Sequence, residues 1–229
     1  MHTTDPQDEL FDVLLPDGTP SGHTKPRGDI HRDGDWHRSL HIWFFRMCGG
    51  RIQVLFQRRS LTKDTWPGAL DVTVGGHFRA GETLEETVRE AAEEVGVAVR
   101  PQELTRIGQR FAVSRDDRWL DREVAEVYAT RIHPDLTKLR LHAEEVDSIV
   151  ALDIANALQV FDGPNRRVTG HEARRGSDGR PTDPVEVGLE RADFVEMNDD
   201  YALEALHRIV LLERGAPFEP FLIKVPLEG

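Results

Sequence analysis

The sequence predicts an α/β fold, because apolar strand-like runs alternate with segments of helical periodicity. The clearest strand signal covers residues 39–48, which are rich in aromatic and aliphatic side chains; Gly49-Gly50 then makes a tight turn into a returning strand over residues 51–57. The clearest helix signal covers residues 83–95, where apolar positions recur at helical spacing. Further strands are predicted at residues 9–15, 70–74, 104–113, 123–131 and 148–152, and further helices at residues 153–160 and 199–214.

The predicted helix over residues 83–95 has defined ends and two distinct faces. Thr83 is an N-cap candidate with Glu86 three residues later, as in a capping box, and Gly96 is a candidate C-terminal stop. One face carries the apolar side chains of Leu84, Val88, Ala91 and Val95, which fall within roughly 60° of one another. The opposite face carries Glu86, Glu90, Glu93 and Glu94.

The glutamates on this face repel one another. Glu86 and Glu90 are four residues apart, as are Glu90 and Glu94, and each such pair costs about a few tenths of a kcal/mol. No cation within the cluster offsets this cost, since Arg89 lies to one side of it. A divalent cation such as Mg²⁺ or Mn²⁺ would remove the repulsion, because such ions prefer carboxylate oxygens. Taken on charge alone, a solvated helix face is the alternative interpretation.

The order of residues around the glutamates resembles the Nudix box of the Nudix hydrolase superfamily. That box reads Gly-x5-Glu-x7-Arg-Glu-U-x-Glu-Glu-x-Gly-U, with U an aliphatic residue. Gly76 and Glu82 match its first half, and its second half is matched by Arg89, Glu90, Ala91, Glu93, Glu94, Gly96 and Val97. Six residues, instead of seven, separate Glu82 from Arg89, so the register between loop and helix and the role of Glu82 stay open.

Segments around the box resemble one branch of the superfamily. The segments are Trp-His-Arg-x-x-His-x-Trp at residues 36–43, Gln57-Arg58-Arg59-Ser60, Trp66-Pro67-Gly68 and Gly75-Gly76-His77. Together they look like the Nudix hydrolases whose closest structural relatives are the type I isopentenyl-diphosphate isomerases, over roughly residues 9–160. This resemblance implies an α/β/α sandwich around a mixed β-sheet, with the box helix packed on one face.

The resemblance also implies roles for the box residues. Glu90, Glu93 and Glu94 would hold Mg²⁺ or Mn²⁺, and the catalytic role centres on Glu94. Arg89 is expected to orient these glutamates through ion pairs, with Glu82 or Glu85 as partners, instead of touching the substrate.

A further carboxylate is expected from the loop before the last strand of the sheet. In many Nudix hydrolases a glutamate at this place completes the site, and Glu145 matches it best, with Glu144 as the second choice. Glu145 is therefore the candidate general base. A carboxylate that merely begins a helix is the alternative.

Basic residues and glycines near the box are candidates for substrate binding. Arg58, Arg59 and Lys63 follow the second strand and could hold substrate phosphates, since arginine gives bidentate contacts; a solvated loop is the alternative. Gly75 and Gly76 would let backbone or a bound phosphate approach closely.

These assignments predict a metal-dependent hydrolase that cleaves the phosphoanhydride bond of a nucleoside di- or triphosphate, or of a nucleoside diphosphate linked to another group. The first alternative is an isopentenyl-diphosphate isomerase, which in this family needs a cysteine in the strand leading to the box. Residues 71–75 contain none, and Cys48 lies elsewhere. The second alternative is a Nudix fold that senses a nucleotide without cleaving it, which the one-residue-short box mildly favours.

Three histidines, His31, His37 and His41, fall within eleven residues. Their spacing does not match a zinc finger, and no cysteines accompany them. The preferred interpretation is therefore ordinary: polar groups at strand edges or in contact with substrate.

Composition limits the class of protein. The 229 residues carry a net charge of −12, which argues against nucleic-acid or anionic-membrane partners. No signal peptide or apolar run of membrane-spanning length is visible, so a cytoplasmic location is expected. Cys48 is expected to be a buried, inert thiol.

The C-terminal third departs from the resemblance. Residues 163–194 are rich in Gly, Pro and Arg and are interpreted as an insertion within a single domain over residues 1–229. This insertion could contain a hairpin near residues 167–171. It is interpreted either as a lid over the substrate phosphates or as a disordered excursion, and the excursion is the preferred interpretation. The charged loop over residues 114–122 carries Trp119, which could stack on a ring or anchor the loop. The apolar tail over residues 218–226 is expected to pack on the domain or to form a homodimer.

Overall fold

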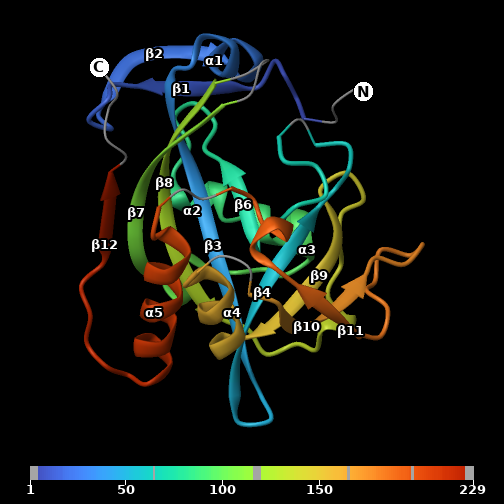
Figure 1. The fold of residues 1–229 in the computed structure, drawn as a ribbon. Helices are drawn as coiled ribbons and strands as arrows, with labels where there is room; N and C mark the ends of the chain where they lie inside the picture. Colours follow the sequence, from blue (N-terminus) through green and yellow to red (C-terminus); the bar gives the residue numbers. More distant parts are fainter. Residues whose placement is uncertain (1–4, 64, 116–119, 164–165, 197–198, 225–229) are drawn as a thin grey trace.

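The computed structural model describes residues 5–63, 65–115, 120–163, 166–196 and 199–224, and within them one twelve-stranded sheet (Figure 1). Its strands are β1 Leu10–Leu14, β2 Pro20–Pro26, β3 Trp36–Cys48, β4 Arg51–Arg59, β5 Leu70–Val72, β6 Val74–His77, β7 Thr105–Arg115, β8 Leu120–Arg131, β9 Val146–Asp153, β10 Val168–Arg174, β11 Val185–Leu189 and β12 Phe221–Lys224. Its helices are α1 Arg27–Asp33, α2 Leu84–Thr87, α3 Glu90–Val95, α4 Ile154–Phe161 and α5 Tyr201–Glu213.

The sheet is mixed, as predicted. Its main path runs β11-β10-β9-β4-β3-β8-β7-β12, with β1, β2, β5 and β6 paired off this path. The β3–β8 and β7–β12 pairs are parallel, and the other pairs are antiparallel. Because β3 pairs with β8 over ten residues in parallel, side chains from distant parts of the chain meet along this seam.

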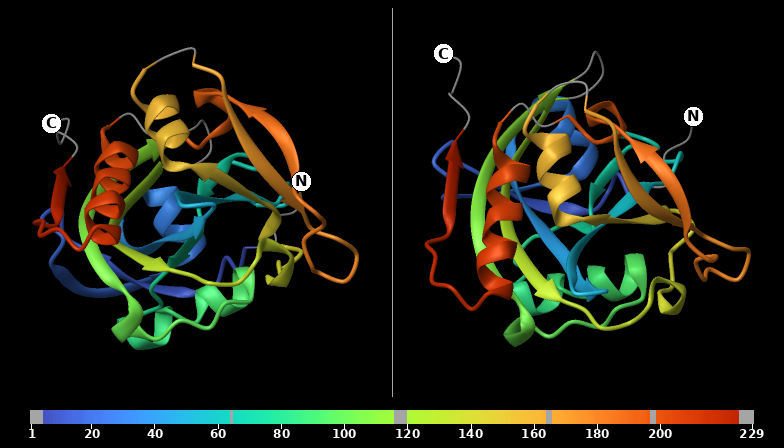
Figure 2. Two further views of the ribbon diagram at one scale, coloured as in Figure 1. Left: turned by 90° about the horizontal axis from the view of Figure 1, so that it is seen from below. Right: turned by 60° about the horizontal axis from the view of Figure 1, so that its bottom comes forward.

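Two hydrophobic cores lie on the two faces of the sheet, because side chains of β3 alternate between them. Trp43 and Phe45 pack in the core that contains residues of α4 and α5. Ile42 and Phe44 pack in the other core with Val88, Ala91 and Val95 of the box segment. Figure 2 shows α4 and α5 on one side of the sheet and the α2–α3 segment on the other, which confirms the expected α/β/α sandwich.

The box helix is interrupted, which corrects the prediction of one helix over residues 83–95. Between α2 and α3 the Arg89 N–H donates to Glu86 O at 3.4 Å and the Ala91 N–H to Val88 O at 3.2 Å, so the turn is of the tighter 3-10 type. A 3-10 turn rises about 2.0 Å per residue against about 1.5 Å in an α-helix, so it can span the same length with fewer residues. The shortened interval between Glu82 and Arg89 overlaps this turn at residues 86–89.

The ends of the box segment are as predicted. The backbone N–H and the hydroxyl of Thr83 both lie 2.9 Å from a carboxylate oxygen of Glu86. Gly96 ends α3 with a φ of 72°, a conformation that favours glycine.

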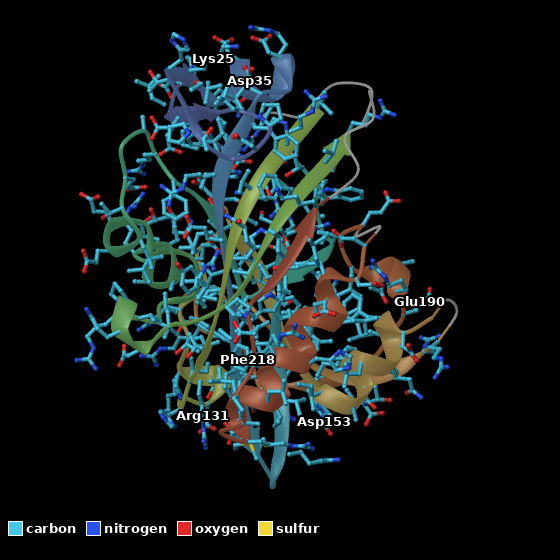
Figure 3. The ribbon with its side chains drawn as sticks, turned by 90° about the vertical axis from the view of Figure 1, so that its left-hand side faces the viewer. Lys25, Asp35, Arg131, Asp153, Glu190 and Phe218 are labelled. Carbon is cyan, nitrogen blue, oxygen red and sulfur yellow. The ribbon has the colours of Figure 1, made fainter. Side chains whose placement is uncertain are left out.

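Near the N-terminus, two expectations need correction. The segment predicted as a loop over residues 19–35 forms β2 and α1, and Gly34, with a φ of 69°, ends α1. Cys48 is exposed at the β3–β4 turn instead of buried, because the strand extends past the core before Gly49-Gly50. Figure 3 shows Lys25 and Asp35 at one end of the molecule, and Arg131 and Asp153 at the other.

The C-terminal third adds to both edges of the sheet. The predicted excursion over residues 163–194 contains the β10–β11 hairpin, and β10 pairs with β9, so residues 168–174 and 185–189 belong to the sheet. At the opposite edge β12 pairs with β7, and Phe221 is buried against Gly108. The predicted C-terminal helix is α5. Much of the loop predicted over residues 114–122 belongs to β7 and β8, and Trp119 lies outside the described residues.

In the described part of the chain, no helix has the length and apolar character required to cross a membrane.

Candidate functional site

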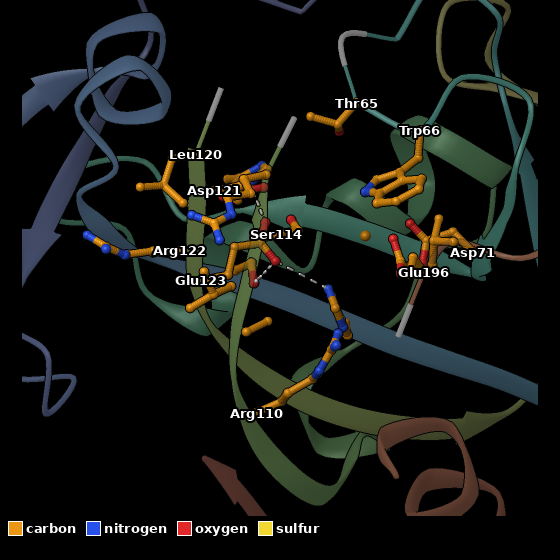
Figure 4. Close-up of a pocket in the computed structure, with 18 of the residues that line it drawn as sticks. Thr65, Trp66, Asp71, Arg110, Ser114, Leu120, Asp121, Arg122, Glu123 and Glu196 are labelled. Carbon is orange, nitrogen blue, oxygen red and sulfur yellow. Dashed lines mark hydrogen bonds and ion pairs between the residues drawn. The ribbon is translucent and has the colours of Figure 1, made fainter. Parts of the chain in front are cut away.

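A pocket of about 830 Å³ opens beside the ends of β3, β6, β7 and β8 (Figure 4). Trp66, Asp71 and Glu196 lie on one side of the view, and Leu120, Asp121 and Arg122 on the other. Its acidic residues are Asp71, Asp121, Glu123, Glu196 and Asp199, and its basic ones are Arg27, Arg59, Lys63, Arg110, Arg115, Arg122 and Lys224. A basic surplus in a chain of net charge −12 suits an anionic ligand.

The predicted substrate-binding residues divide into two groups. Arg59, Lys63, Gly75 and Gly76 line the pocket. Arg58 does not; its Nε donates to Glu172 at 2.7 Å, which explains why its side chain stays away from the pocket.

Arg59 holds the loop that follows β4. Its guanidinium donates to the backbone oxygen and the hydroxyl of Thr65, both at 3.1 Å, and to Asp71 at 3.2 Å. These three bonds place Thr65, and with it the next residue, Trp66, at the pocket wall. Arg59 therefore shapes the pocket through the loop.

The box glutamates lie next to the pocket without lining it. Glu94 is 3% exposed and accepts a hydrogen bond from Gln57 at 3.0 Å. Burial, and then the charges of Glu90 and Glu145, raise the pKa of Glu94 well above its usual value. Burial likewise raises the pKa of Glu90 to about 7. The side chain of Glu93 is 54% exposed, so it contributes less to this buried group.

Arg89 is placed to orient these carboxylates. It forms an ion pair with Glu82, lies 3.2 Å from Glu90 and lies 3.4 Å from Glu93. The Glu82 carboxylate also accepts the hydroxyl of Thr87 at 3.1 Å. Glu82 therefore anchors Arg89 despite the shortened spacing between them.

Lys63 connects the pocket with the box carboxylates. Its Nζ lies 2.6 Å from Glu145 and 2.5 Å from Asp5, while the lysine itself lines the pocket. Glu145 in turn contributes to the raised pKa of Glu94. Glu90 and Glu145 both raise the pKa of Glu94, and grouped carboxylate oxygens are the donors that a hard divalent cation takes, so the three residues fit Mg²⁺ or Mn²⁺.

A second group of candidate metal ligands lies at the pocket itself. Ligand atoms of His31, His37 and His77 lie within 4.8 Å of one another, and so do those of His37, Asp121 and Glu123. We call these five residues the histidine–carboxylate cluster. The sequence interpretation disfavoured a histidine metal site; His31 and His37 nevertheless belong to these candidate groups, and His41 does not.

Two buried nitrogens in the histidine–carboxylate cluster have the chemistry of metal ligands. His31 Nε2 and His37 Nε2 are buried and make no hydrogen bond within the described residues, and they lie 3.8 and 3.6 Å from Asp121 Oδ1. Burial lowers the pKa of both histidines to about 3, so both are neutral at pH 7. Neutral imidazoles beside carboxylates form a donor set that suits a divalent transition metal.

The cluster is assembled by strand register. His37 lies opposite Glu123 in the parallel β3–β8 pair, and Ser39 lies opposite His77 in the antiparallel β3–β6 pair. His77 Nε2 lies 3.0 Å from one oxygen of Glu123, and Ser39 donates to the other at 3.2 Å. The sequence placed Glu123 at the start of a predicted strand and His77 after the strand predicted over residues 70–74, and neither placement reveals the pairing.

Comparison with known proteins shows the family. Residues 35–169 match the NUDIX domain model. The chain belongs to the Nudix family. Nudix hydrolase 3 of Arabidopsis thaliana is 40% identical over 147 residues, which cover 62% of this chain and 19% of the plant protein. An uncharacterized Nudix hydrolase of Clostridium acetobutylicum is 30% identical over 159 residues, covering 68% of this chain and 75% of that protein.

The predicted branch is also borne out. An isopentenyl-diphosphate Delta-isomerase of Escherichia coli is 30% identical over 157 residues, covering 68% of this chain and 83% of the isomerase. Nudix hydrolases and isomerases are thus both relatives of this Nudix protein, and the hydrolases support a pyrophosphohydrolase enzyme. The chain spans only about a fifth of the length of the Arabidopsis relative.

The pocket extends beyond the part of the chain that matches the Nudix model. Val195, Glu196, Asp199 and Lys224 line it, and all four follow residue 169. The segment before α5 and strand β12 therefore complete a wall of the pocket that the family's shared domain does not supply.

Proposed function

We propose that this Nudix protein is a Mg²⁺- or Mn²⁺-dependent hydrolase that cleaves the phosphoanhydride bond of a nucleoside di- or triphosphate, or of a nucleoside diphosphate linked to another group. The observation that carries the proposal is the pair formed by the buried Glu94 and the partly buried Glu90, whose raised pKa values indicate a site that favours cations. Gly76, which touches Glu90 and also lines the basic pocket, brings this pair next to the place where an anion would bind.

The substrate's diphosphate would lie at the basic end of the pocket. Lys63 is held between Asp5 and Glu145, and Arg27 lies 3.8 Å from Asp5, so a phosphate would replace a carboxylate as the partner of these cations. Such an exchange conserves charge pairing, and charge-assisted contacts to phosphate are strong. Gly75 and Gly76 leave the backbone of β6 open to close approach.

Each acidic residue has a distinct role in this proposal. Glu90 and Glu94 would hold the cation, with Glu93 at its exposed side and Arg89 as the positioning residue. A bound divalent cation neutralises charge on phosphate oxygens and lowers the pKa of bound water. Glu145, which lies 2.6 Å from Lys63 Nζ at the edge of the pocket, would accept the proton of the attacking water.

The histidine–carboxylate cluster would hold a second divalent cation at the pocket. The support is the pair of buried, unbonded nitrogens of His31 and His37 that face Asp121. A cation there would lie near the proposed diphosphate position, since Arg27 Nη1 is 3.3 Å from His77 Nδ1.

An isomerase acting on isopentenyl diphosphate is the alternative, which the Escherichia coli relative favours. In the described residues no cysteine lines the pocket, and Cys48 lies at the far turn of the β3–β4 hairpin. A nucleotide-sensing protein without catalysis is a further alternative. It would bind the same ligands and release no product.

The test is a screen of diphosphate compounds with Mg²⁺ or Mn²⁺, with products identified by mass and with isopentenyl diphosphate included. We expect hydrolysis of at least one nucleoside diphosphate derivative. The variant Glu94→Gln should lose it by roughly 100-fold or more, since a metal ligand is removed, while Glu93→Gln, exposed on the same helix, should lose less. Turnover by Glu94→Gln near the parent level at saturating Mg²⁺ would refute the assignment.

A further inference from the structure

A buried hydrogen-bonded chain connects helix α5 with the pocket wall. The indole Nε1 of Trp43 donates to the hydroxyl oxygen of Tyr201 at 2.9 Å, and His41 Nδ1 lies 2.7 Å from the same oxygen. Tyr201 is fully buried, and its ring meets that of Trp43 edge-on at a centroid distance of 5.8 Å. These hydrogen bonds therefore connect strand β3 with helix α5 inside the protein.

The directions of the hydrogen bonds between Trp43, Tyr201 and His41 determine the tautomer of His41. An indole N–H can only donate, so the oxygen of Tyr201 is the acceptor from Trp43. The O–H of Tyr201 is buried, and the partner left for it among the described residues is His41 Nδ1. If Tyr201 donates to Nδ1, that nitrogen carries a lone pair and the proton of the neutral ring is on Nε2.

The protonated nitrogen of His41 faces the pocket. His41 lines the pocket, and its Nε2 lies 3.9 Å from Glu123 Oε2, too far for a direct hydrogen bond. Cross-strand partners share a face of the sheet, and the partner of His41 on β6 is Gly75, which has no side chain to fill the space beside the imidazole. The Nε2–H is therefore placed to donate to a bound molecule.

Tyr201 follows the part of the chain that matches the Nudix model, and it is fixed by Asp199, which also follows that part, and by Arg110, which lies within it. Its backbone N–H donates to Asp199 at 3.2 Å, and Asp199 also accepts Arg110 at 2.8 Å. The guanidinium of Arg110 lies over the Tyr201 ring at 4.7 Å. These contacts hold the phenol in one position, and position 201 follows the matched residues 35–169.

We propose that His41 is a neutral hydrogen-bond donor to an oxygen of the bound diphosphate, and that Tyr201 is the positioning residue that fixes its tautomer. The inference rests on the proposed function, since it assigns a substrate contact within the same pocket. A neutral donor of fixed orientation stabilises negative charge on a phosphoryl oxygen without needing to reorganise when the substrate binds. It transfers no proton.

The first experiment determines the tautomer of His41 directly. Long-range ¹H–¹⁵N spectra of the labelled full chain at pH 8, with His41 identified by its loss in His41→Gln, distinguish a protonated Nε2 from a protonated Nδ1. We expect protonated Nε2 alone in the wild type and a mixture of tautomers in Tyr201→Phe, which cannot donate to Nδ1. Protonated Nδ1 in the wild type would overturn the proposal.

The second experiment measures the contact with substrate. His41→Leu removes the donor and should weaken binding of inorganic pyrophosphate with Mn²⁺ by roughly 10- to 100-fold, the effect of losing a hydrogen bond to a charged group. His41→Gln, whose amide can donate from a similar place, should recover most of the affinity. His207→Gln, an exposed position on α5, is the matched control and should bind as the wild type does.

The outcomes separate this inference from the proposed function. Equal pyrophosphate affinity in His41→Leu and wild type would refute the contact even if the enzyme hydrolyses nucleoside diphosphates. A wild type that hydrolyses none of ADP-ribose, UDP-glucose and dATP, yet shows protonated Nε2 and weaker binding in His41→Leu, would refute the hydrolase and support His41. If Tyr201→Phe does not fold, the wild-type spectrum and the two His41 variants still decide the question.

Discussion

Gly76 lies so close to Glu90 that a β-carbon at position 76 would meet Glu90 Cγ at 2.7 Å and Glu90 Cβ at 3.3 Å. Strand β6 and helix α3 are thus in contact at the point where the box presents a buried carboxylate. A side chain at position 76 would push Glu90 out of place, because its own stem, and not only its flexible end, is in the way.

We therefore expect Gly76→Ala to lower the affinity for Mn²⁺ by about tenfold or more, the size of effect seen when the surroundings of a metal ligand are disturbed. Mn²⁺ titration followed by calorimetry measures this. Gly75→Ala is the matched control for metal binding, since its nearest neighbour would be Val72 Cγ2 at an ordinary 3.7 Å. Equal Mn²⁺ affinity in the two variants would show that the contact does not position Glu90.

Glu90 should contribute less to the stability of the metal-free protein as the pH rises from about 5 to 8, while His31 and His37, whose pKa values are lowered, act in the opposite direction below about pH 6.5. Burial raises the pKa of Glu90 from 4.5 to about 7, so its stabilising, protonated form is complete below about pH 4.5 and is lost as the pH passes about 7. The difference corresponds to about 3 kcal/mol of unfolding free energy, and the raised pKa of Glu94 acts in the same direction.

Thermal unfolding in EDTA across this pH range measures the effect. Glu90→Gln should show a smaller loss of Tm between pH 5 and pH 8 than the wild type, since the amide does not ionise. Adding Mn²⁺ at pH 8 should raise the Tm of the wild type, because the cation binds the ionised carboxylates. Tm values of the wild type and of Glu90→Gln in EDTA that change in parallel over this range would contradict the assignment.

The Nudix box and the β3–β4 hairpin could be predicted from the sequence because the residues that indicate them are close together in the chain. Thr83, Glu86 and Gly96 lie within fourteen residues, and Gly49-Gly50 turns directly between two strands. The interruption of the box helix could not be foreseen from periodicity, since the apolar spacing continues through Val88 while the hydrogen bonds tighten.

The histidine–carboxylate cluster depends on pairings that local sequence does not reveal. His37 meets Glu123 only because β3 and β8 run parallel in one register, and His77 joins them through β6. The same holds for Tyr201, whose contact with His41 spans 160 positions in the chain. Residues of this kind are found once the sheet order is known.

The histidine–carboxylate cluster should bind one metal ion independently of the box. We expect His37→Asn to lose about one equivalent of Mn²⁺ or Zn²⁺ per chain relative to wild type, as measured by elemental analysis after dialysis, because a fully buried ligand is replaced by a weaker one. His23→Asn, an exposed histidine on β2, is the control and should keep the wild-type content. Identical metal content in all three proteins would refute the second site.

Substitutions at Arg58 and Lys63 should have different effects: the first should lower the stability of the protein, and the second should weaken substrate binding. Arg58→Met removes one charged partner of the buried Glu172, which keeps Ser148 at 2.7 Å and Arg174 at 3.5 Å, and should cost about 2 kcal/mol of unfolding free energy with little change in KM. Lys63→Met should raise KM for the diphosphate by roughly tenfold, since a cation lining the pocket is lost. Chemical unfolding and steady-state kinetics measure the two effects. A raised KM in Arg58→Met with an unchanged KM in Lys63→Met would reverse the two assignments.

Cleavage of a phosphoanhydride by water is tested most directly by incubating the protein with Mn²⁺ and ADP-ribose, UDP-glucose, dATP or isopentenyl diphosphate in H₂¹⁸O. The account predicts that mass spectrometry finds a nucleotide or phosphate product carrying one ¹⁸O from at least one nucleotide, and no such product with Glu94→Gln. Recovery of every nucleotide intact by a protein that binds Mn²⁺, or conversion of isopentenyl diphosphate to its isomer without ¹⁸O in the phosphates, would contradict it.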